Sequence, residues 1–451
     1  MIHSINPYNN QVLASFQLLS EQQLDAKLAA AQASFLSWKA YSHSKRGEII
    51  KRVGILLKEQ HEKMAMLASK EMGKPIREAK AEVLKCITAC NYYAENAVKQ
   101  LAPEIITSDY EESFVRYDPL GTILGIMPWN FPYWQVFRFA VPVLMAGNTA
   151  LLKHASNVPQ CAIAIEKLFL EAGLPEGVFQ TLLISAEQAT QLVYDERIKA
   201  VSLTGSTEAG SKVAEAAGKS IKKVVLELGG SDPFIVLADA NIQEAARQAV
   251  KARLQNNGQS CIAAKRFIIE AGAMAEFIAV VKSELHKLIV GDQLQEITNI
   301  GPLAKKEFAD TLQKQLQDGI KNGAKFLHEG KIQGALFEPV LVELNNSENP
   351  LFTEETFGPV MAVMQVKDAS EAINIANDSL YGLGASIWTK DISRAKQLAA
   401  QIESGSVFIN TMVKSDARLP FGGIKQSGYG RELSLHGIRE FVNVKTVVVN
   451  P

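Results

Sequence analysis

The amino-acid sequence predicts an α/β protein with two bodies, each built on a parallel sheet, and a small β arm. From about residue 120 onward, short apolar runs alternate with helical patterns, which is typical of strand–helix–strand units. Two such sets follow one another, and two β-rich segments fit neither set. A chain of 451 residues can form two or more domains, and a cleft between two domains is a usual place for ligands to meet.

The first hundred residues are expected to be helical. Ser20 and Gln23 have the spacing of a capping box, which predicts a helix start. Apolar residues then recur at helical spacing and indicate a buried face with no chemistry of its own: Leu24, Leu28, Ala31, Phe35 and Trp38.

The strand-like runs divide between the two bodies. The first set is "TILGIMPW", "TALLKHAS", "VFQTLLIS", "KAVSLTG" and "KVVLELGG". The second set is "PFIVLADA", "RFIIEAG", "VMAVMQV", "GASIWT" and "SVFIN". We assign residues 1–104 and 120–228 to the first body and residues 229–428 to the second.

The remaining segments, 105–119 and 429–451, are expected to form the arm. Both contain polar and β-branched residues, and the second includes "VKTVVVN". An exposed strand rich in valine invites pairing along its edge. We therefore expect an interface with a second copy of the chain, in a homodimer or homotetramer.

Composition excludes several classes of protein. A net charge of −1 gives no general attraction to nucleic acid or to an anionic membrane. No apolar run has the length of about eighteen residues that a membrane span needs, and the first residues lack the features of a targeting signal. We expect a cytoplasmic protein whose cysteines are reduced thiols. Cys86 and Cys90 have no Cys-His cluster nearby, so no metal site is expected.

Cys261 is the first candidate for chemistry. It stands in "NGQSCIAAKRF", after a Gly-Gln-Ser turn. We expect Gly258 to make this turn flexible, and little bulk precedes the sulfur, so a substrate could approach a thiolate there. Most cysteines are small buried residues, so on this observation alone a packing role stays open.

Glu227 and Asn130 are the next two candidates. Glu227 lies in the apolar run "KVVLELGG", where burial would raise its pKa toward that of a general base. Prolines bracket Asn130 in "PWNFP", and an amide held rigidly can stabilise an oxyanion. The alternatives are a glutamate that reaches water at a strand end and a proline-rich loop that only packs.

A glycine turn at "GSTEAG" (205–210) follows the run "AVSLT" and opens a helix. Backbone N–H groups at such a helix start can face a pyrophosphate. The alternative is a simple helix cap by Ser206 or Thr207, which would use the same atoms.

Taken together, these segments resemble the aldehyde dehydrogenase family. The motifs "PWNFP", "LTGSTEAG", "LELGG", "GQSC", "EETFGP" and "PFGGIKQSGYGRE" occur in the family's order and at its approximate spacings, and Cys261 follows Glu227 by 34 positions. The resemblance extends from about residue 5 to residue 447. It implies the aldehyde dehydrogenase fold, with a Rossmann-like dinucleotide-binding domain in the first body, a catalytic domain in the second, and an oligomerisation arm.

The resemblance also implies a two-step oxidation of an aldehyde to a carboxylic acid. Cys261 would attack the aldehyde to form a thiohemiacetal, with the oxyanion held by the Asn130 amide and the backbone N–H of Cys261. Hydride transfer to a nicotinamide would leave a thioester, which water activated by Glu227 would hydrolyse. The cofactor residues implied are Trp129, Lys153, Ser156, Gly205, Ser206, Glu355 and Phe357.

Ser156 departs from many relatives that use NAD. Those carry a glutamate three residues after the position of Lys153, where it accepts the ribose 2′-hydroxyl. A small neutral serine removes repulsion toward a 2′-phosphate and leaves Lys153 free to pair with it. We therefore expect use of NADP, alone or beside NAD. His154, where proline is common in the family, receives no interpretation.

Arg138 is the main indication of the substrate. It lies in the otherwise apolar "WQVFRFAVPVLM", where a cation needs an anionic partner. The segment resembles that of short succinate-semialdehyde dehydrogenases, which implies a clamp on the distal carboxylate, with Arg418 as a rival. A structural ion pair is the alternative. The other implied substrate contacts are Phe131, Trp134, Ser415 and Phe421.

Other substrates, another reaction and another class of protein remain as alternatives. The substrate could be another semialdehyde, such as glutarate semialdehyde, or a general aliphatic aldehyde. A CoA-acylating reaction is disfavoured because Glu227 is present to deliver water. A catalytically silent binding protein on the same fold is disfavoured because Cys261, Glu227 and Asn130 occur together.

Overall fold

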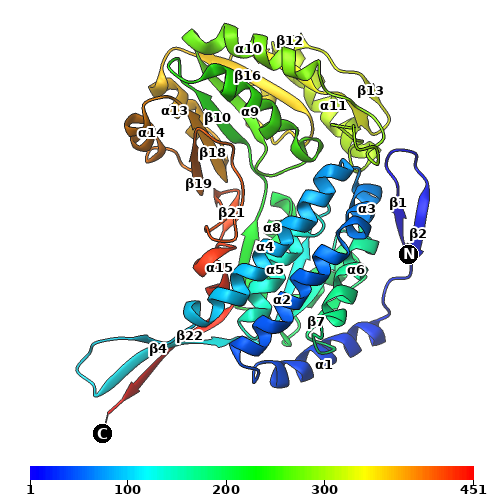
Figure 1. Ribbon diagram of the computed structural model, residues 1–451, viewed down its shortest axis with the longest axis vertical. Helices are drawn as coiled ribbons and strands as arrows, with labels where there is room; N and C mark the ends of the chain where they lie inside the picture. Colours follow the sequence, from blue (N-terminus) through cyan, green and yellow to red (C-terminus); the bar gives the residue numbers. More distant parts are fainter. Residues whose placement is uncertain (451) are drawn as a thin grey trace.

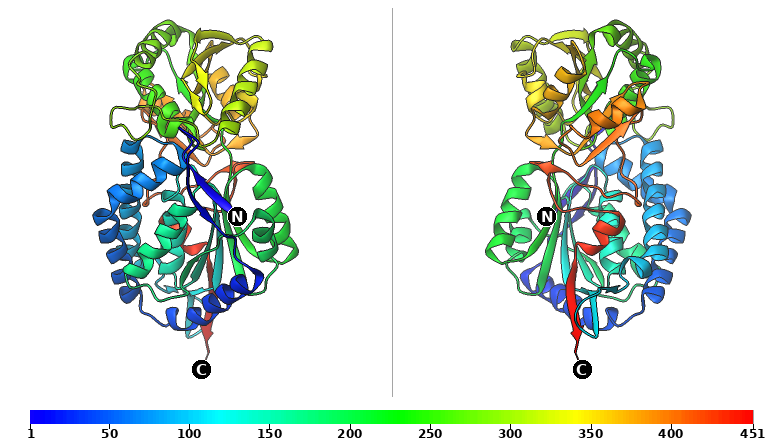
Figure 2. Two further views of the ribbon diagram at one scale, coloured as in Figure 1. Left: turned by 90° about the vertical axis from the view of Figure 1, so that its right-hand side faces the viewer. Right: turned by 90° about the vertical axis from the view of Figure 1, so that its left-hand side faces the viewer.

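A computed structural model describes residues 1–450. It contains two α/β bodies, one above the other in Figures 1 and 2, with a β arm projecting from the lower body. The aldehyde dehydrogenase fold expected from the sequence is confirmed, and every strand-like run named above contains a strand. No helix among residues 1–450 is long and apolar enough to cross a membrane.

The first body is built on a six-stranded sheet with the order β21-β9-β8-β5-β6-β7. Strands β5 to β9 are parallel, and β21 pairs antiparallel with β9. The strands are β5 (Thr122–Met127), β6 (Thr149–His154), β7 (Phe179–Thr181), β8 (Ile198–Thr204), β9 (Lys223–Glu227) and β21 (Gly428–Tyr429). The helices are α1 (Glu21–Trp38), α2 (His43–Glu59), α3 (His61–Met72), α4 (Ile76–Gln100), α5 (Trp134–Met145), α6 (Pro159–Glu171), α7 (Ala186–Leu192), α8 (Thr207–Lys219) and α15 (Ser434–Arg439).

Helix α5 is buried on every side, as its nearly uniform apolar sequence requires. It packs against α4 and α2 and against strands β5 and β6. The close approach to β5 depends on Gly125, since a Cβ at that position would lie 2.3 Å from Cε1 of Phe139. This helix carries Arg138 and Trp134 into the interior of the molecule.

The second body is built on a seven-stranded sheet with the order β12-β15-β16-β11-β10-β18-β19, in which only β12 is antiparallel to its neighbour. The strands are β10 (Asp232–Val236), β11 (Ala264–Glu270), β12 (Lys325–His328), β15 (Val340–Leu344), β16 (Val360–Val366), β18 (Gly384–Trp388) and β19 (Ser406–Ile409). The helices are α9 (Ile242–Leu254), η1 (Gln255–Gly258), α10 (Ala271–Leu285), α11 (Lys306–Lys321), α12 (Pro350–Thr353), α13 (Ala369–Asn377) and α14 (Ile392–Ala399). Two small pairs complete it: β13 (Ile332–Gln333) with β14 (Leu336–Phe337), and β17 (Tyr381–Gly382) with β20 (Ile424–Lys425).

The arm is a three-stranded antiparallel sheet of β3 (Glu104–Ile105), β4 (Glu112–Pro119) and β22 (Val442–Val449). Its strands come from both segments that the sequence assigned to the arm, and Figure 1 shows it extending away from the first body. Helix α15 also lies within the predicted 429–451 segment, but it packs against α4 and α5 of the first body. The domain limits drawn from the sequence stay a prediction.

The N-terminus differs from the expectation that the first hundred residues are helical. Residues 2–16 form an antiparallel hairpin of β1 (Ile2–Ile5) and β2 (Val12–Phe16). The hairpin turns at Asn10, whose φ is 58°, and β1 contacts α3 and α6. Strands of four and five residues are too short to show a clear period in the sequence. The capping box at Ser20 and Gln23 is confirmed.

Candidate active site

Cys261 follows a turn whose backbone is left-handed at three consecutive residues. The φ angles are 57° at Asn256, 57° at Asn257 and 74° at Gly258. The expectation that Gly258 supplies flexibility is wrong. A Cβ on Gly258 would lie 2.5 Å from the backbone of Gly358, so glycine is required for close packing and for the positive φ.

Side-chain amides hold the two asparagines in this uncommon conformation. Asn257 donates to the carbonyls of Gly73, at 3.0 Å, and Pro302, at 2.9 Å. Asn256 donates to the carbonyl of Asn130, at 2.8 Å. The turn before the cysteine is therefore tied both to the first body and to the loop that carries the candidate oxyanion donor.

Asn130 is buried between two glutamines. Its Nδ2 donates to the carbonyl of Gln259 at 3.0 Å, and its Oδ1 accepts from Nε2 of Gln135 at 3.0 Å. These two bonds fix the orientation of the amide, and Nδ2 keeps a second N–H. The rigidity expected from the flanking prolines comes in addition from these side-chain contacts.

His154 contacts the same loop through its ring nitrogens. Its Nε2 lies 2.9 Å from the carbonyl of Pro132, and its Nδ1 lies 3.2 Å from the carbonyl of Met127 and 2.9 Å from the backbone nitrogen of Ala155. Burial lowers the pKa of His154 to about 4, and the ring is neutral. This histidine therefore joins the end of β6 to the loop of Asn130.

Glu227 is the last residue of β9 and is 1% exposed. Within residues 1–450 neither carboxylate oxygen has a hydrogen-bond partner. Burial raises the pKa of Glu227 to about 8, while the Arg138 charge acts in the opposite direction. The nearest cation is NH2 of Arg138, 3.8 Å from Oε2. A buried carboxylate with this proton affinity suits a general base near neutral pH.

Arg138 has an anionic partner inside the protein. Its Nε forms an ion pair with Glu432, and its NH2 donates to Oγ1 of Thr204 at 3.3 Å. The guanidinium also lies 4.7 Å from the ring centroid of Phe421. The structural ion pair considered from the sequence is therefore present.

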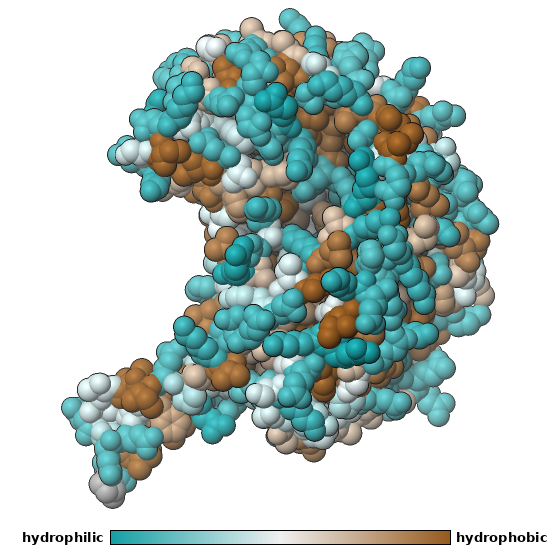
Figure 3. Space-filling model, in the orientation of Figure 1, coloured by the Kyte–Doolittle hydropathy of each residue, from teal (hydrophilic) through white to brown (hydrophobic). Residues whose placement is uncertain are grey.

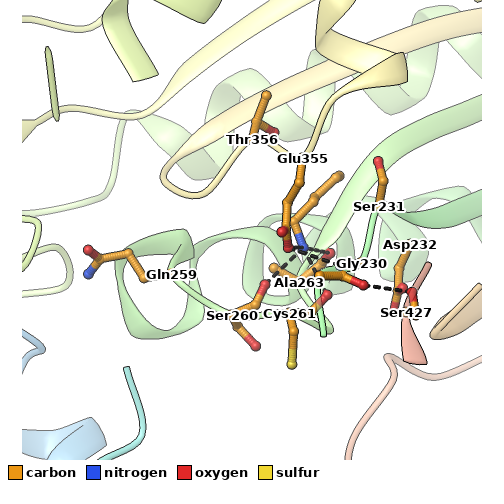
Figure 4. A network of polar contacts seen from close by, with 12 residues as sticks. Gly230, Ser231, Asp232, Gln259, Ser260, Cys261, Ala263, Glu355, Thr356 and Ser427 are labelled. Atoms are coloured by element: carbon orange, nitrogen blue, oxygen red, sulfur yellow. Dashed lines mark hydrogen bonds and ion pairs between the residues drawn. The ribbon is translucent and has the colours of Figure 1, made fainter. Parts of the chain in front are cut away.

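Cys261 stands where two cavities meet. It lines a cavity of 510 Å³ and another of 670 Å³, and Gln135 is the other lining residue that the two share. Burial raises the pKa of the Cys261 thiol to about 12, the Arg138 charge acting against it. Figure 4 shows the sulfur directed away from Glu355. Because Cys261 lines both cavities, its sulfur can contact one molecule bound in each of them.

The larger cavity contains most of the expected cofactor residues: Trp129, Gly205, Ser206, Glu355 and Phe357. Trp129 and Phe357 meet edge to face with centroids 5.8 Å apart. Ser206 is the N-cap of α8, and its hydroxyl accepts from the N–H of Ala209 at 3.3 Å. The cap considered as an alternative is present, and Gly205, Ser206 and Glu208 at the start of α8 line this cavity.

Lys153 and Ser156 do not line that cavity. Lys153 is half-buried at the end of β6, and burial lowers its pKa. Ser156 is exposed and lines a separate cavity of 450 Å³, together with Lys305 and Lys306. The structure thus separates these two expected residues from Glu355 and Phe357.

Two buried cations behind the site were missed from the sequence. Lys265 donates to the carbonyl of Cys261 at 2.8 Å and lies 3.3 Å from Oε1 of Glu355, which also accepts from the N–H of Gly230. Arg253 donates to the carbonyl of Thr356 at 2.9 Å. For Lys265 the sequence offered a signal, because a basic residue next to the apolar stretch "RFII" is costly to bury unless it has partners; the polar neighbours of Arg253 gave none.

The smaller cavity contains all five residues expected for the substrate: Phe131, Trp134, Arg138, Ser415 and Phe421. Oγ of Ser415 accepts from Nε1 of Trp134, at 2.9 Å, and from Nζ of Lys85, at 2.8 Å. Lys85 was missed, because nothing in its helical sequence marks the face that meets the cavity. The rival clamp Arg418 is exposed, pairs with Asp416 and does not line this cavity.

Glu82 is a further residue that the sequence did not mark. Its Oε1 accepts from the N–H groups of Tyr133, at 2.7 Å, and Trp134, at 2.9 Å, at the start of α5. Its Oε2 forms an ion pair with Lys74, and both side chains are at most 2% exposed. A carboxylate at this end of a helix satisfies free N–H groups and complements the helix dipole.

The sequence and fold agree with one family. Residues 1–447 match the model of the aldehyde dehydrogenase family. The chain is 49% identical to a Synechocystis protein named probable succinate-semialdehyde dehydrogenase, NADP(+), with 99% of each chain covered. It is 44% identical to a Mycobacterium tuberculosis protein named succinate-semialdehyde dehydrogenase 1, NADP(+), again with 99% of each covered. A succinic semialdehyde dehydrogenase of Streptococcus pyogenes, solved with NADP+, superposes with a TM-score of 0.97 at 36% identity over all of both chains.

The fold and these relatives define an enzyme that oxidises aldehydes. The chain belongs to the aldehyde dehydrogenase family.

Proposed function

We propose that this enzyme oxidises succinate semialdehyde to succinate, with NADP as cofactor, alone or beside NAD. The observation that supports this most directly is the position of Cys261 between two cavities. The smaller one combines aromatic walls with the buried Arg138 and the half-buried Lys85, which suits an aldehyde that carries a carboxylate at its far end. Relatives named as succinate-semialdehyde dehydrogenases support the same substrate.

In the proposed reaction the Cys261 thiol releases its proton to water, and the thiolate adds to the aldehyde carbon to give a thiohemiacetal, which becomes a thioester when hydride leaves that carbon. The second N–H of Asn130 Nδ2 and the backbone N–H of Cys261 stabilise the oxyanion. A nicotinamide cofactor, when bound, supplies the acceptor for the hydride. Glu227 then takes a proton from the water that cleaves the thioester, a role that fits its raised pKa of about 8.

The 670 Å³ cavity is the proposed cofactor site. Its lining fits a nicotinamide nucleotide, because it offers aromatic faces at Trp129 and Phe357, a carboxylate at Glu355 and the N-terminus of α8. Lys153 and Ser156 would contact the adenosine end. A neutral Ser156 beside a lysine supports NADP, as does the NADP+ in the Streptococcus pyogenes structure.

An aldehyde panel tests the proposal. Succinate semialdehyde, glutarate semialdehyde and butanal are each assayed by absorbance of the reduced cofactor, with NAD and NADP in separate reactions. We expect the highest kcat/KM with succinate semialdehyde and NADP. A preference for glutarate semialdehyde or for butanal would replace the proposed substrate with that alternative, and a preference for NAD would overturn the cofactor assignment.

We further propose that the arm joins copies of this chain in a homo-oligomer. Several apolar side chains of the arm are exposed: Ile105, Ile106, Tyr110, Val444, Val448 and Val449. Figure 3 shows apolar patches on this projecting part. Sedimentation of a Val444→Lys, Val448→Lys variant should give a smaller species than the unmodified chain. A cytoplasmic location and the absence of nucleic-acid and membrane partners stay predictions.

A further inference from the structure

Lys85 is a cation in the smaller cavity whose charge no protein group neutralises. It lies on α4, opposite the helix that carries Trp134, and it is half-buried. Among residues 1–450 its Nζ forms no ion pair, and its one hydrogen bond is to Oγ of Ser415, at 2.8 Å. Nζ lies 4.3 Å from the ring centroid of Trp134, which holds the ammonium group against an aromatic face.

Arg138 differs from Lys85 in this respect. Its guanidinium is paired with Glu432, and Glu227 lies nearby at 3.8 Å. A substrate carboxylate placed on Arg138 would have to share this buried cation with Glu432, which is already paired with it. The charge of Arg138 is therefore already engaged by Glu432.

The other cations that line the cavity are less suited than Lys85. Arg247 is exposed and lies 3.4 Å from Glu244, with which it pairs. Lys251 and Lys414 are exposed, so water screens their charges. Lys85 combines partial burial, an unneutralised charge and a hydroxyl partner that can share an anion.

We propose that Lys85, together with Ser415, binds the distal carboxylate of the substrate and so determines the preference for a semialdehyde over an uncharged aldehyde. This inference rests on the proposed function and names the residues that give it its substrate class. The ammonium group supplies charge, the Ser415 hydroxyl supplies a second donor, and Phe131 and Trp134 enclose the chain between the carboxylate and the aldehyde.

The test compares Lys85→Met, which removes the charge at similar length, with Lys85→Arg, which keeps it. Each is assayed with succinate semialdehyde and with butanal, the uncharged aldehyde with the same number of carbons. We expect Lys85→Met to raise KM for succinate semialdehyde by about 10- to 100-fold with kcat little changed. KM for butanal should stay within about twofold, and Lys85→Arg should recover most of the loss.

A pH series gives a second readout. Burial, with Arg138 next, lowers the pKa of Lys85 to about 8, while Cys86, Glu82 and Asp416 act in the opposite direction. The lysine loses its charge as pH rises through that value, so KM for succinate semialdehyde, divided by KM for butanal, should increase between pH 7 and pH 9. In Lys85→Arg the ratio should stay flat. Lys99→Met, an exposed lysine on the same helix, is the matched control.

The outcomes separate the two proposals. If the unmodified enzyme does not prefer succinate semialdehyde to butanal, the proposed function fails. If it does prefer succinate semialdehyde and Lys85→Met keeps that preference, the role of Lys85 is refuted while the proposed function stands. The role of Lys85 would also be refuted if Lys85→Met lowered kcat/KM equally for both substrates and Lys85→Arg did not restore it.

Discussion

Arg138 forms a buried ion pair with Glu432 and leaves Glu227, 3.8 Å from its NH2, without a hydrogen-bond partner among residues 1–450. All three side chains are at most 4% exposed. One cation thus faces two carboxylates, and Glu432 is the closer of the two. Burial and the Glu432 charge both raise the pKa of Glu227, which fits the role of general base proposed for this glutamate.

The Glu432→Gln variant tests this relationship. Removing the Glu432 charge lowers the pKa of Glu227, because one raising influence disappears and Arg138 can turn toward the remaining carboxylate. If Glu227 is the general base, kcat/KM falls below pH 8 as it becomes protonated. In the variant we expect this acidic limb to move to lower pH by on the order of one unit. If the fall of kcat/KM at acidic pH occurs at the same pH in a folded Glu432→Gln variant, the charge of Glu432 does not influence the pKa of Glu227.

Alkylation by iodoacetamide should single out Cys261. Its thiol lines both cavities, whereas Cys86, Cys90 and Cys161 are fully buried. Because its pKa is raised to about 12, the thiolate fraction increases with pH throughout the neutral range. In the enzyme without cofactor we expect the rate to rise about tenfold per pH unit between pH 7 and pH 9. Peptide mass spectrometry identifies the labelled site, and a plateau near pH 8 would contradict the expectation.

Loss of the Glu82 charge should weaken the whole first body. Glu82 caps α5 through the N–H groups of Tyr133 and Trp134 and pairs with the buried Lys74. Glu82→Gln leaves that lysine without a counter-charge, so we expect the free energy of unfolding to fall by about 3 kcal/mol. Urea denaturation measures the change.

The matched control is an ion pair at the surface. Glu208 pairs with Lys212 on α8, and both side chains are largely exposed. Glu208→Gln should leave the urea midpoint unchanged because water already screens that pair. If both substitutions changed the urea midpoint equally, the buried contacts of Glu82 would stabilise the protein no more than a surface ion pair does.

A Ser156→Glu substitution should reverse the cofactor preference. A carboxylate at position 156, in the cavity that Lys305 and Lys306 also line, would repel a 2′-phosphate and could accept a hydrogen bond from a ribose 2′-hydroxyl. We expect kcat/KM with NADP to fall by about 100-fold and kcat/KM with NAD to fall much less. Ser156→Ala, which adds no charge, should keep the preference of the unmodified enzyme. A glutamate variant that still prefers NADP would mean that this position does not face the phosphate.

Local patterns predicted much of what the structure contains. The alternation of strands and helices placed both sheets, and the capping box placed the start of α1. The short hairpin at residues 2–16 was missed, because its strands carry too few residues to show a period. Gly258 was interpreted as flexible, whereas its φ of 74° and the nearby Gly358 backbone require a residue without a side chain.

The sequence by itself determined the family and the strand order along the chain, and it supplied the three residues proposed for catalysis, because these depend on motifs of a few adjacent residues. Only the tertiary structure decided which cation is neutralised and which is free. Arg138 meets Glu432 on the loop before α15, and Lys85 meets Ser415 at a separation of 330 positions. The charge that a buried group carries depends on the groups around it in space, and packing of the two bodies brings those groups together from distant parts of the chain.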